Sequence, residues 1–267
     1  MTVKDILDCI TEIAPLHWQE SYDNAGLQVG DLNAEVRKAL ICLDITEAVV
    51  DEAIAKNCNL IISHHPLIFN GLKHLTPQTY IERAVMKAIK HDIALISMHT
   101  NLDNSYLGVS RVLAEKLGLK NLHFLQPSAD EPGACGLGMV GELEKPLEET
   151  DFLKLVSEII ASPCLRHSAL TGRKIQKVAL CGGSGSPFMA EALRQMADAY
   201  LTADIKYHDF FVPEGNILLV DGGHFETEQF TKELICGLIQ KKFPTFAAEI
   251  AETNTNAVCY FVNKNNQ

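Results

Sequence analysis

The stretch NLIISHHPLIFNG (residues 59–71) places a short apolar run directly before Ser63, two adjacent histidines and a proline. The run has the length of a buried strand. Two imidazoles at the end of such a strand need polar partners, which an apolar neighbourhood does not provide. We therefore expect this strand to deliver His64 and His65 to a functional site.

The segments around this strand repeat one arrangement of short apolar runs and amphipathic stretches. They predict a strand over 38–44, a helix over 46–57, a strand over 59–63, a helix over 77–92 and a strand over 93–98. The alternation is typical of βαβ units. Because the strands are apolar throughout, they indicate a parallel or mixed sheet that is covered on both faces. Before them, the sequence predicts a helix that Pro15 closes and a polar, turn-rich stretch over 17–31.

The second half of the chain follows the same order of elements. KVALCGGSGS (177–186) corresponds to the strand over 38–44, and NILLVDGGHFETE (216–228) corresponds to the segment that begins at residue 93. Between the two copies we expect a strand, a turn at Lys145–Pro146 and a helix. The prediction is an α/β protein with two similar lobes, 1–125 and 126–267, each a mixed or parallel sheet flanked by helices.

Charge and hydropathy exclude several classes of protein. The 267 residues carry 23 basic and 34 acidic side chains, for a formal net charge of −11, which disfavours a nucleic-acid partner. No run of 18 or more apolar residues predicts a membrane span, and the N-terminus lacks the features of a signal peptide. We expect a cytoplasmic protein that does not bind membranes. Its eight cysteines show no CxxC spacing and read as buried, reduced side chains.

Histidines and carboxylates follow three of the predicted strands. His64 and His65 follow strand 59–63, His99 and Asp103 follow strand 93–98, and His224, Glu226 and Glu228 follow strand 217–221. The carboxyl ends of parallel strands lie at one edge of a sheet, so we expect these loops to converge on one site. The spacing His-x-x-x-acid occurs twice, and a helical turn would place both side chains on one face. Glu226 is off this face, so we expect it to be exposed or to support the ligands.

These residue types favour a metal site. Imidazole and carboxylate without thiolate suit zinc, manganese, iron or cobalt. Three or four histidines with two acids exceed the needs of one ion, so we expect two divalent ions that share a carboxylate. Isolated histidines are more often hydrogen-bonded loop residues, and we expect this of His17, His74, His91, His123 and His167.

Two further segments have alternative interpretations. CGGSGS (181–186) between a strand and a helix resembles an anion-binding turn, but tight strand-to-helix packing also explains its glycines. DIKYHD (204–209) brings Lys206 and His208 to a predicted strand end. It is either a solvated rim or a source of substrate-binding cations and a proton shuttle.

Seven motifs in this order resemble the NIF-three-like dinuclear-metal proteins, many of which are named GTP cyclohydrolase 1 type 2 homologs. The resemblance covers nearly the whole chain. With about 50 residues between the two copies, this chain resembles the short form of the family without an inserted domain. Ala203 is a departure, since many relatives have glycine there. The motifs are SYDNAGLQVG, LDIT, SHHPLIF, HTNLD, ALCGGSG, ADIKYHD and GHFETE.

The resemblance implies a specific set of ligands and an assembly. It implies that Glu228 bridges both ions and that His99 lines the site in a supporting or proton-transfer role. It also implies a toroidal homohexamer, a trimer of dimers with the metal sites facing an inner cavity. The implied metal ligands are His64, His65, Asp103, His224 and Glu228.

The expected function is a dinuclear metal-dependent hydrolase that uses a metal-bridging water or hydroxide on a nucleotide or phosphate-bearing substrate. His99 or His208 would transfer protons, while Lys206 and the amides of 182–185 would hold a phosphate. The alternative is a non-enzymatic metal-binding hexamer that stores or delivers ions or interacts with other proteins. Both use the same metal ligands, so only the residues around the ions can distinguish them.

Overall fold

The computed structural model describes residues 1–131 and 133–261. Its contacts divide the chain into two compact units, not at one boundary between 125 and 126 as expected. The first unit comprises Met1–Val112, Pro127–Leu137 and Gln229–Thr255. The second comprises Leu113–Gln126, Gly138–Glu228 and the segment from Asn256. Residue 132 and residues 262–267 of the expected second lobe lie outside the described residues.

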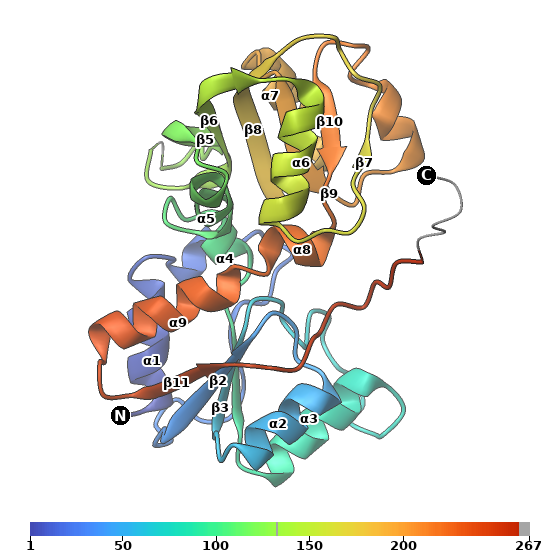
Figure 1. Cartoon of the computed structure of the whole chain (residues 1–267). Helices are drawn as coiled ribbons and strands as arrows, with labels where there is room; N and C mark the ends of the chain where they lie inside the picture. The colour runs from blue at the N-terminus through green and yellow to red at the C-terminus, as the bar shows by residue number, and fades with distance from the viewer. Residues whose placement is uncertain (132, 262–267) are drawn as a thin grey trace. The chain divides into compact units, whose positions relative to one another are not determined.

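The first unit contains a five-stranded mixed sheet (Figure 1). In spatial order its strands are β1 (Gly26–Val29), β4 (Ala94–Ser97), β3 (Leu60–Ser63), β2 (Lys38–Cys42) and β11 (Ala247–Ile250). β11, β2, β3 and β4 pair in parallel, and β1 pairs with β4 in the antiparallel sense. The predicted mixed sheet is confirmed.

Helices cover both faces of this sheet. Successive strand residues face opposite sides, so Leu40 and Ile61 pack with α2 and α3, while Ile41 and Ile62 pack with α1 and α9. Both faces are thus apolar, which explains the continuous apolar runs in the sequence. The helices that contribute to this unit are α1 (Val3–Thr11), η1 (Leu16–Trp18), α2 (Glu47–Ala55), α3 (Tyr80–Lys90), α4 (Thr100–Asp103), α5 (Val109–Lys116) and α9 (Thr231–Lys242).

The second unit contains a six-stranded mixed sheet. In spatial order its strands are β5 (Lys120–Pro127), β6 (Gly136–Leu147), β8 (Ile175–Ser184), β9 (Ala199–Ala203), β10 (Leu218–Asp221) and β7 (Arg166–His167). Figure 1 shows α6 lying across one face of this sheet. The helical segments are α6 (Glu149–Ile159), η2 (Ser186–Phe188), α7 (Met189–Arg194), η3 (Tyr207–Phe211) and α8 (His224–Glu228).

The predicted internal repeat is visible in the strand order. Each unit has three neighbouring parallel strands in chain order, β2–β3–β4 in the first and β8–β9–β10 in the second. The copies differ in their second crossover, because α3 lies between β3 and β4 whereas the short η3 lies between β9 and β10.

Several local predictions are wrong. The polar stretch over 17–31 contains the edge strand β1, in which Gln28 hydrogen-bonds the backbone of Ile68. The turn expected at Lys145–Pro146 lies inside β6, where the register with β8 shifts between Glu142 and Leu147. Proline is tolerated at such an irregularity because no ladder hydrogen bond needs its missing N–H.

The C-terminal elements belong to the first unit. β11 pairs with β2 through residues such as Ala248 and Ala39, and α9 packs against the same sheet through Ile235 and Ile239. This pairing joins segments more than 200 positions apart, so no local pattern predicts it. Because of this pairing, the first unit includes residues from both ends of the chain.

Candidate metal centre

Backbone hydrogen bonds fix the two adjacent histidines at the end of β3. The His64 amide donates to Cys42 O at 3.3 Å, and the His65 amide donates to Leu43 O at 3.0 Å. The Ser63 hydroxyl donates to His65 O at 2.7 Å. Parallel pairing with the end of β2 therefore continues past the strand and holds both imidazoles at the carboxyl edge of the sheet.

The HTNLD motif forms a short helix directly after β4. His99 is the N-cap residue of α4, and its carbonyl accepts from the amides of Leu102 and Asp103 at 2.8 and 3.1 Å. The helical turn suggested by the His-x-x-x-Asp spacing is therefore present, and it places Asp103 above His99 on one face.

Four candidate residues come together in the first unit. His64, His65 and His99 each offer a ring nitrogen within 4.8 Å of the others. His64 is fully buried, and its Nε2 lies 3.7 Å from Asp103 Oδ1. Three imidazoles and a carboxylate form a donor set that zinc, manganese, iron and cobalt all accept. The chemistry of these residues therefore fits a divalent metal ion.

Each of the three imidazoles is oriented through Nδ1. His64 donates to the Met98 carbonyl at 2.8 Å, His65 to Asp44 Oδ1 at 2.7 Å and His99 to Asp23 Oδ1 at 2.8 Å. Such contacts select the tautomer of a metal-binding histidine and raise the basicity of its other nitrogen. Nε2 is therefore the atom that an ion would use.

Asp23 is a buried carboxylate that stays ionised. Burial by itself raises its pKa, but hydrogen bonds from His99 and Thr100 outweigh this effect and lower the pKa to about 2. The Thr100 amide donates to Asp23 Oδ2 at 3.0 Å, and its hydroxyl donates to the same atom. The start of α4 thus holds the carboxylate that orients His99.

The second unit carries a smaller cluster at the carboxyl end of β10. His224 and Glu228 are the first and last residues of α8, and His224 Nε2 lies 3.1 Å from Glu228 Oε2. His224 Nδ1 donates to Asp204 Oδ2 at 2.6 Å. Burial lowers the pKa of His224, but the two carboxylates more than compensate and raise it to about 11. Binding of a metal at Nε2 would displace this proton.

The glycines of CGGSGS allow close packing against α8 and β9. Gly183 has φ +62°, and a Cβ there would lie 2.0 Å from Glu228 Oε1. The Gly183 amide donates to Thr227 Oγ1 at 3.0 Å, and the Gly185 amide donates to Thr202 Oγ1 at 2.9 Å. Both amides donate within the protein, which supports the packing interpretation at these two glycines; the phosphate role expected for 182–185 stays a prediction.

The residues of DIKYHD differ in their environment. Asp204 contacts His224, as described above, whereas Lys206 and His208 are exposed. His208 packs beside the rings of Tyr207 and Phe211 in η3. The roles expected for Lys206 and His208 in substrate binding and proton transfer stay predictions.

Glu226 is buried, so the expectation of an exposed side chain is wrong. It is 5% exposed, and its Oε1 accepts from Asn256 Nδ2 at 3.0 Å. A Cβ at Gly223 would lie 2.2 Å from Glu226 Oε2. The carboxylate therefore folds back against the turn that begins α8.

Sequence reasoning missed the carboxylates that orient the histidines. Asp204 follows directly after β9 and Asp44 lies two residues after β2, so their position at strand ends was a usable signal. Asp23 lies in a polar stretch without periodicity, and its pairing with His99 spans 76 positions. No local pattern indicates that contact.

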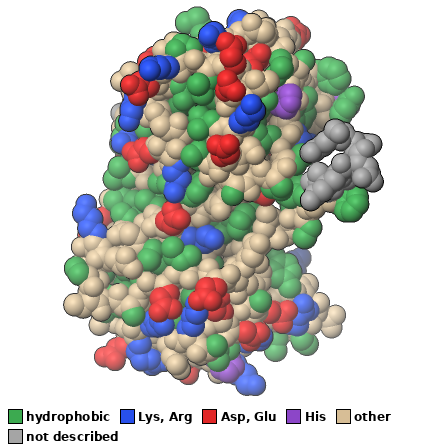
Figure 2. All heavy atoms as spheres, in the orientation of Figure 1, with side chains coloured by type: hydrophobic (Ala, Val, Ile, Leu, Met, Phe, Trp, Pro, Cys, Tyr) green, Lys and Arg blue, Asp and Glu red, His purple; other side chains and the backbone are tan. Residues whose placement is uncertain are grey.

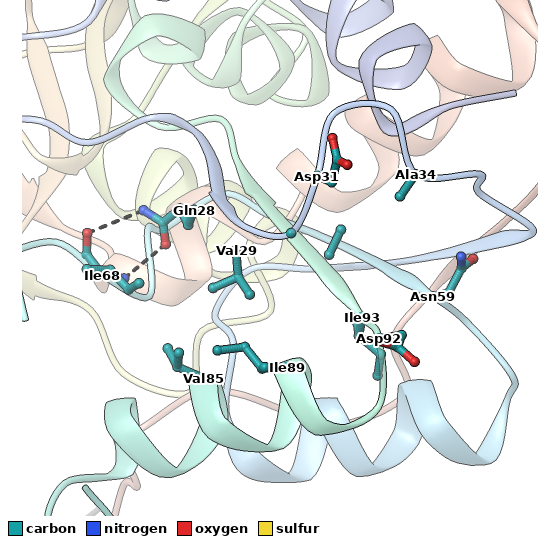
Figure 3. Close-up of a pocket in the computed structure, with 12 residues that line it drawn as sticks. Gln28, Val29, Asp31, Ala34, Asn59, Ile68, Val85, Ile89, Asp92 and Ile93 are labelled. Carbon is teal, nitrogen blue, oxygen red and sulfur yellow. Dashed lines mark hydrogen bonds between the residues drawn. The ribbon is translucent and has the colours of Figure 1, made fainter. Parts of the chain in front are cut away.

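A cavity of about 550 Å³ in the first unit lies apart from these residues. Figure 3 shows Val85 and Ile89 of α3 pointing into it below Val29 of β1. None of the eight candidate site residues lines it. Its lining includes Asp31 and Asp92 but no histidine or cysteine, so we assign the chemistry to the strand-end histidines and not to this cavity.

The fold and the site define a mixed α/β protein of two similar units with imidazole and carboxylate side chains at strand ends. The chain belongs to the Duf34/NIF3 (NGG1p interacting factor 3) family, whose sequence profile matches residues 1–257. The predicted family is therefore confirmed.

Individual relatives agree with this assignment. A Clostridium acetobutylicum protein named GTP cyclohydrolase 1 type 2 homolog is 36% identical over 231 residues, which cover 85% of each chain. The crystal structure of Staphylococcus aureus hypothetical protein SA1388 has a TM-score of 0.92 at 31% identity and covers 98% of this chain and 99% of its own. The Bacillus cereus protein related to NIF3 has a TM-score of 0.91 at 25% identity and covers the same shares.

Proposed function

We propose that the protein is a dinuclear metal-dependent hydrolase. The observation that carries the proposal is the anchoring through Nδ1 of the four histidines of the candidate metal centre, three of them to carboxylates. This arrangement is typical of histidines that bind metals through Nε2. The proposed ligands of the two divalent ions are His64, His65, Asp103, His224 and Glu228, with the Glu228 carboxylate shared between the ions.

The remaining residues have roles in proton transfer and substrate binding. Two divalent ions, when bound, would lower the pKa of a water molecule enough for attack on an electrophilic centre at neutral pH. His99, oriented by Asp23 at 2.8 Å, would accept and return the proton. His208 is the alternative residue for proton transfer, and Lys206 would bind the anionic part of a nucleotide or phosphate-bearing substrate. The name GTP cyclohydrolase 1 type 2 homolog of several relatives supports a nucleotide.

The test is elemental analysis of protein purified without added metal, combined with product release from GTP and a panel of phosphoesters. We expect close to two ions per chain in the wild type, and loss of both metal and turnover in Glu228→Ala. Glu158→Ala, which removes an exposed carboxylate of the second unit, should retain both. A wild-type protein without metal would refute the proposal.

One observation favours the non-enzymatic alternative. The amides of Gly183 and Gly185 donate within the protein, so two of the four amides expected to hold a phosphate are already engaged. Lys206→Ala separates the two functions, because a hydrolase should keep its metal and lose at least about tenfold in kcat/KM when a charged contact to the substrate is removed. Lys154→Ala is the control for an exposed lysine in the same unit. Two ions without turnover on any substrate would favour metal storage or delivery.

We also propose that the protein acts as a homohexamer, a trimer of dimers, in the cytoplasm. Six copies would present several metal sites to one inner cavity. None of the helices in the described part of the chain has the length and apolar character needed to cross a membrane.

A further inference from the structure

The segment that follows β11 makes a series of side-chain hydrogen bonds. The Ala251 amide donates to Ile41 O at 2.8 Å, so the segment leaves the sheet beside the end of β2. Thr253 then contacts Glu52 on α2. The next two contacts, from Thr255 and Asn256, reach carboxylates that adjoin candidate metal ligands.

Thr255 holds the carboxylate that orients His65. Its hydroxyl donates to Asp44 Oδ2 at 3.0 Å, while Asp44 Oδ1 accepts from His65 Nδ1 at 2.7 Å. Both carboxylate oxygens are therefore engaged, one by the histidine and one by the threonine. A carboxylate held at both oxygens cannot rotate without breaking a bond, so Thr255 restricts the direction in which Asp44 points its acceptor.

Asn256 plays the equivalent part in the second unit. Its side-chain amide donates to Glu226 Oε1 at 3.0 Å, and Glu226 is 5% exposed. Loss of a donor to a buried carboxylate is costly, and Glu226 lies on α8 between His224 and Glu228. Asn256 therefore stabilises the helix that carries two candidate ligands.

We propose that Thr255 and Asn256 are positioning residues of the metal site. In the first unit Thr255 supports Asp44, which orients the candidate ligand His65. In the second unit Asn256 supports α8, which carries two candidate ligands. This inference rests on the proposed metal-binding function and adds a role for a segment that contributes no ligand. The competing interpretation is a structural tether, the role that Thr253 has through Glu52.

The experiment compares isosteric variants of two threonines in the same segment. Thr255→Val removes the hydroxyl that donates to Asp44, the carboxylate that orients His65. Thr253→Val removes the hydroxyl that donates to Glu52 on α2. The readouts are the dissociation constant for zinc, from competition with a chromophoric chelator, and the visible absorption of the cobalt-substituted protein. We expect about tenfold weaker zinc binding and a changed cobalt spectrum for Thr255→Val, with wild-type values for Thr253→Val and Thr255→Ser.

A second variant tests the contact in the other unit. Asn256→Asp keeps an oxygen for the Val258 amide, which Asn256 Oδ1 accepts at 3.0 Å, but it replaces the donor to Glu226 with a second carboxylate. We expect zinc binding to weaken about tenfold, because repulsion would shift α8 and its two ligands.

The outcomes separate this inference from the proposed function. A wild-type protein that binds no zinc or cobalt overturns both. A wild-type protein that binds them, together with unchanged zinc affinity and cobalt spectrum in Thr255→Val and Asn256→Asp, overturns the positioning role alone. Equal loss of zinc affinity in Thr253→Val and Thr255→Val also overturns the positioning role. Both threonines would then act only by anchoring the segment.

Discussion

At the scale of single residues, the site is defined by how each imidazole uses its two nitrogens. Three histidines donate Nδ1–H to a carboxylate, and His64 donates it to a backbone carbonyl. These contacts fix ring orientation before any ion binds. Removal of an orienting acid should therefore weaken metal binding without removing a ligand.

Asp44→Asn tests this expectation. The amide keeps the size of the side chain but loses the charge that supports His65, so we expect zinc affinity to fall roughly 10- to 100-fold. Chelator competition measures the change. Asp51→Asn is the control, because Asp51 is an exposed acid that pairs with Lys87. Unchanged affinity in Asp44→Asn would mean that Asp44 does not orient a ligand.

Two features require glycine at position 183: the close approach of the Glu228 carboxylate and the positive φ of the backbone. Gly183→Ala would place a methyl group 2.0 Å from the present position of Glu228 Oε1, so the carboxylate must move and metal affinity should fall at least about tenfold. Gly172→Ala is a matched control, with φ +73° and no atom within 4 Å of the added Cβ. Both variants should lose about 1 kcal/mol of stability, and only Gly183→Ala should lose metal.

At the scale of elements, two short helices and one clamp matter most. α4 and α8 each span one turn and carry the His-x-x-x-acid pairs. The clamp is Glu52 on α2, which accepts from the backbone amides of Glu252 and Thr253 at 2.8 and 2.9 Å. It anchors the segment after β11 to a helix of the same unit.

The Glu52 clamp should be sensitive to acid. Burial raises the pKa of Glu52, but hydrogen bonds from Lys56, Thr253 and the two amides lower it from 4.5 to about 2. Because the folded-state pKa is the lower one, the stabilisation is present above pH 4.5 and is lost as the pH falls towards 2. We expect Glu52→Gln to lose about 2 kcal/mol at neutral pH.

Urea unfolding of wild type and Glu52→Gln across this range measures the effect. The difference in unfolding free energy should narrow below pH 4.5 and be nearly absent near pH 2. A difference that does not change with pH would show that the charge of Glu52 is not involved.

At the scale of the whole molecule, the chain builds two units of the same plan. The path passes from one to the other several times, and β11 returns to pair with β2. The net charge is −11, yet Figure 2 shows acidic and basic side chains interspersed on the face in view. The whole-molecule property that matters most for the proposed function is the assembly.

Native mass spectrometry of the purified protein measures the assembly directly. The proposed homohexamer predicts a mass of six chains of 29.4 kDa each, with dimers as the main product of partial dissociation. A chelator-treated sample shows whether the metal contributes to the assembly. A monomer at micromolar concentration would contradict the hexamer.

The sequence by itself determined the local elements and the candidate ligands. Apolar runs of strand length, amphipathic helices with capping threonines such as Thr46, and histidines after strands are all local patterns. They depend on periodicity and on neighbours within a few positions. The fold class, the internal repeat and the helical turn over HTNLD could therefore be predicted from the residues alone.

Only the tertiary structure decided which distant groups meet. Asp23 reaches His99 across 76 positions and Asp44 reaches His65 across 21, while β11 selects β2 as its neighbour. Hydrogen-bond acceptors and strand partners are chosen by long-range packing, and their local sequences resemble those of many other loops and strands. The requirement for glycine at position 183 also comes from long-range packing. Space is needed there only because α8, which carries Glu228, packs against β8.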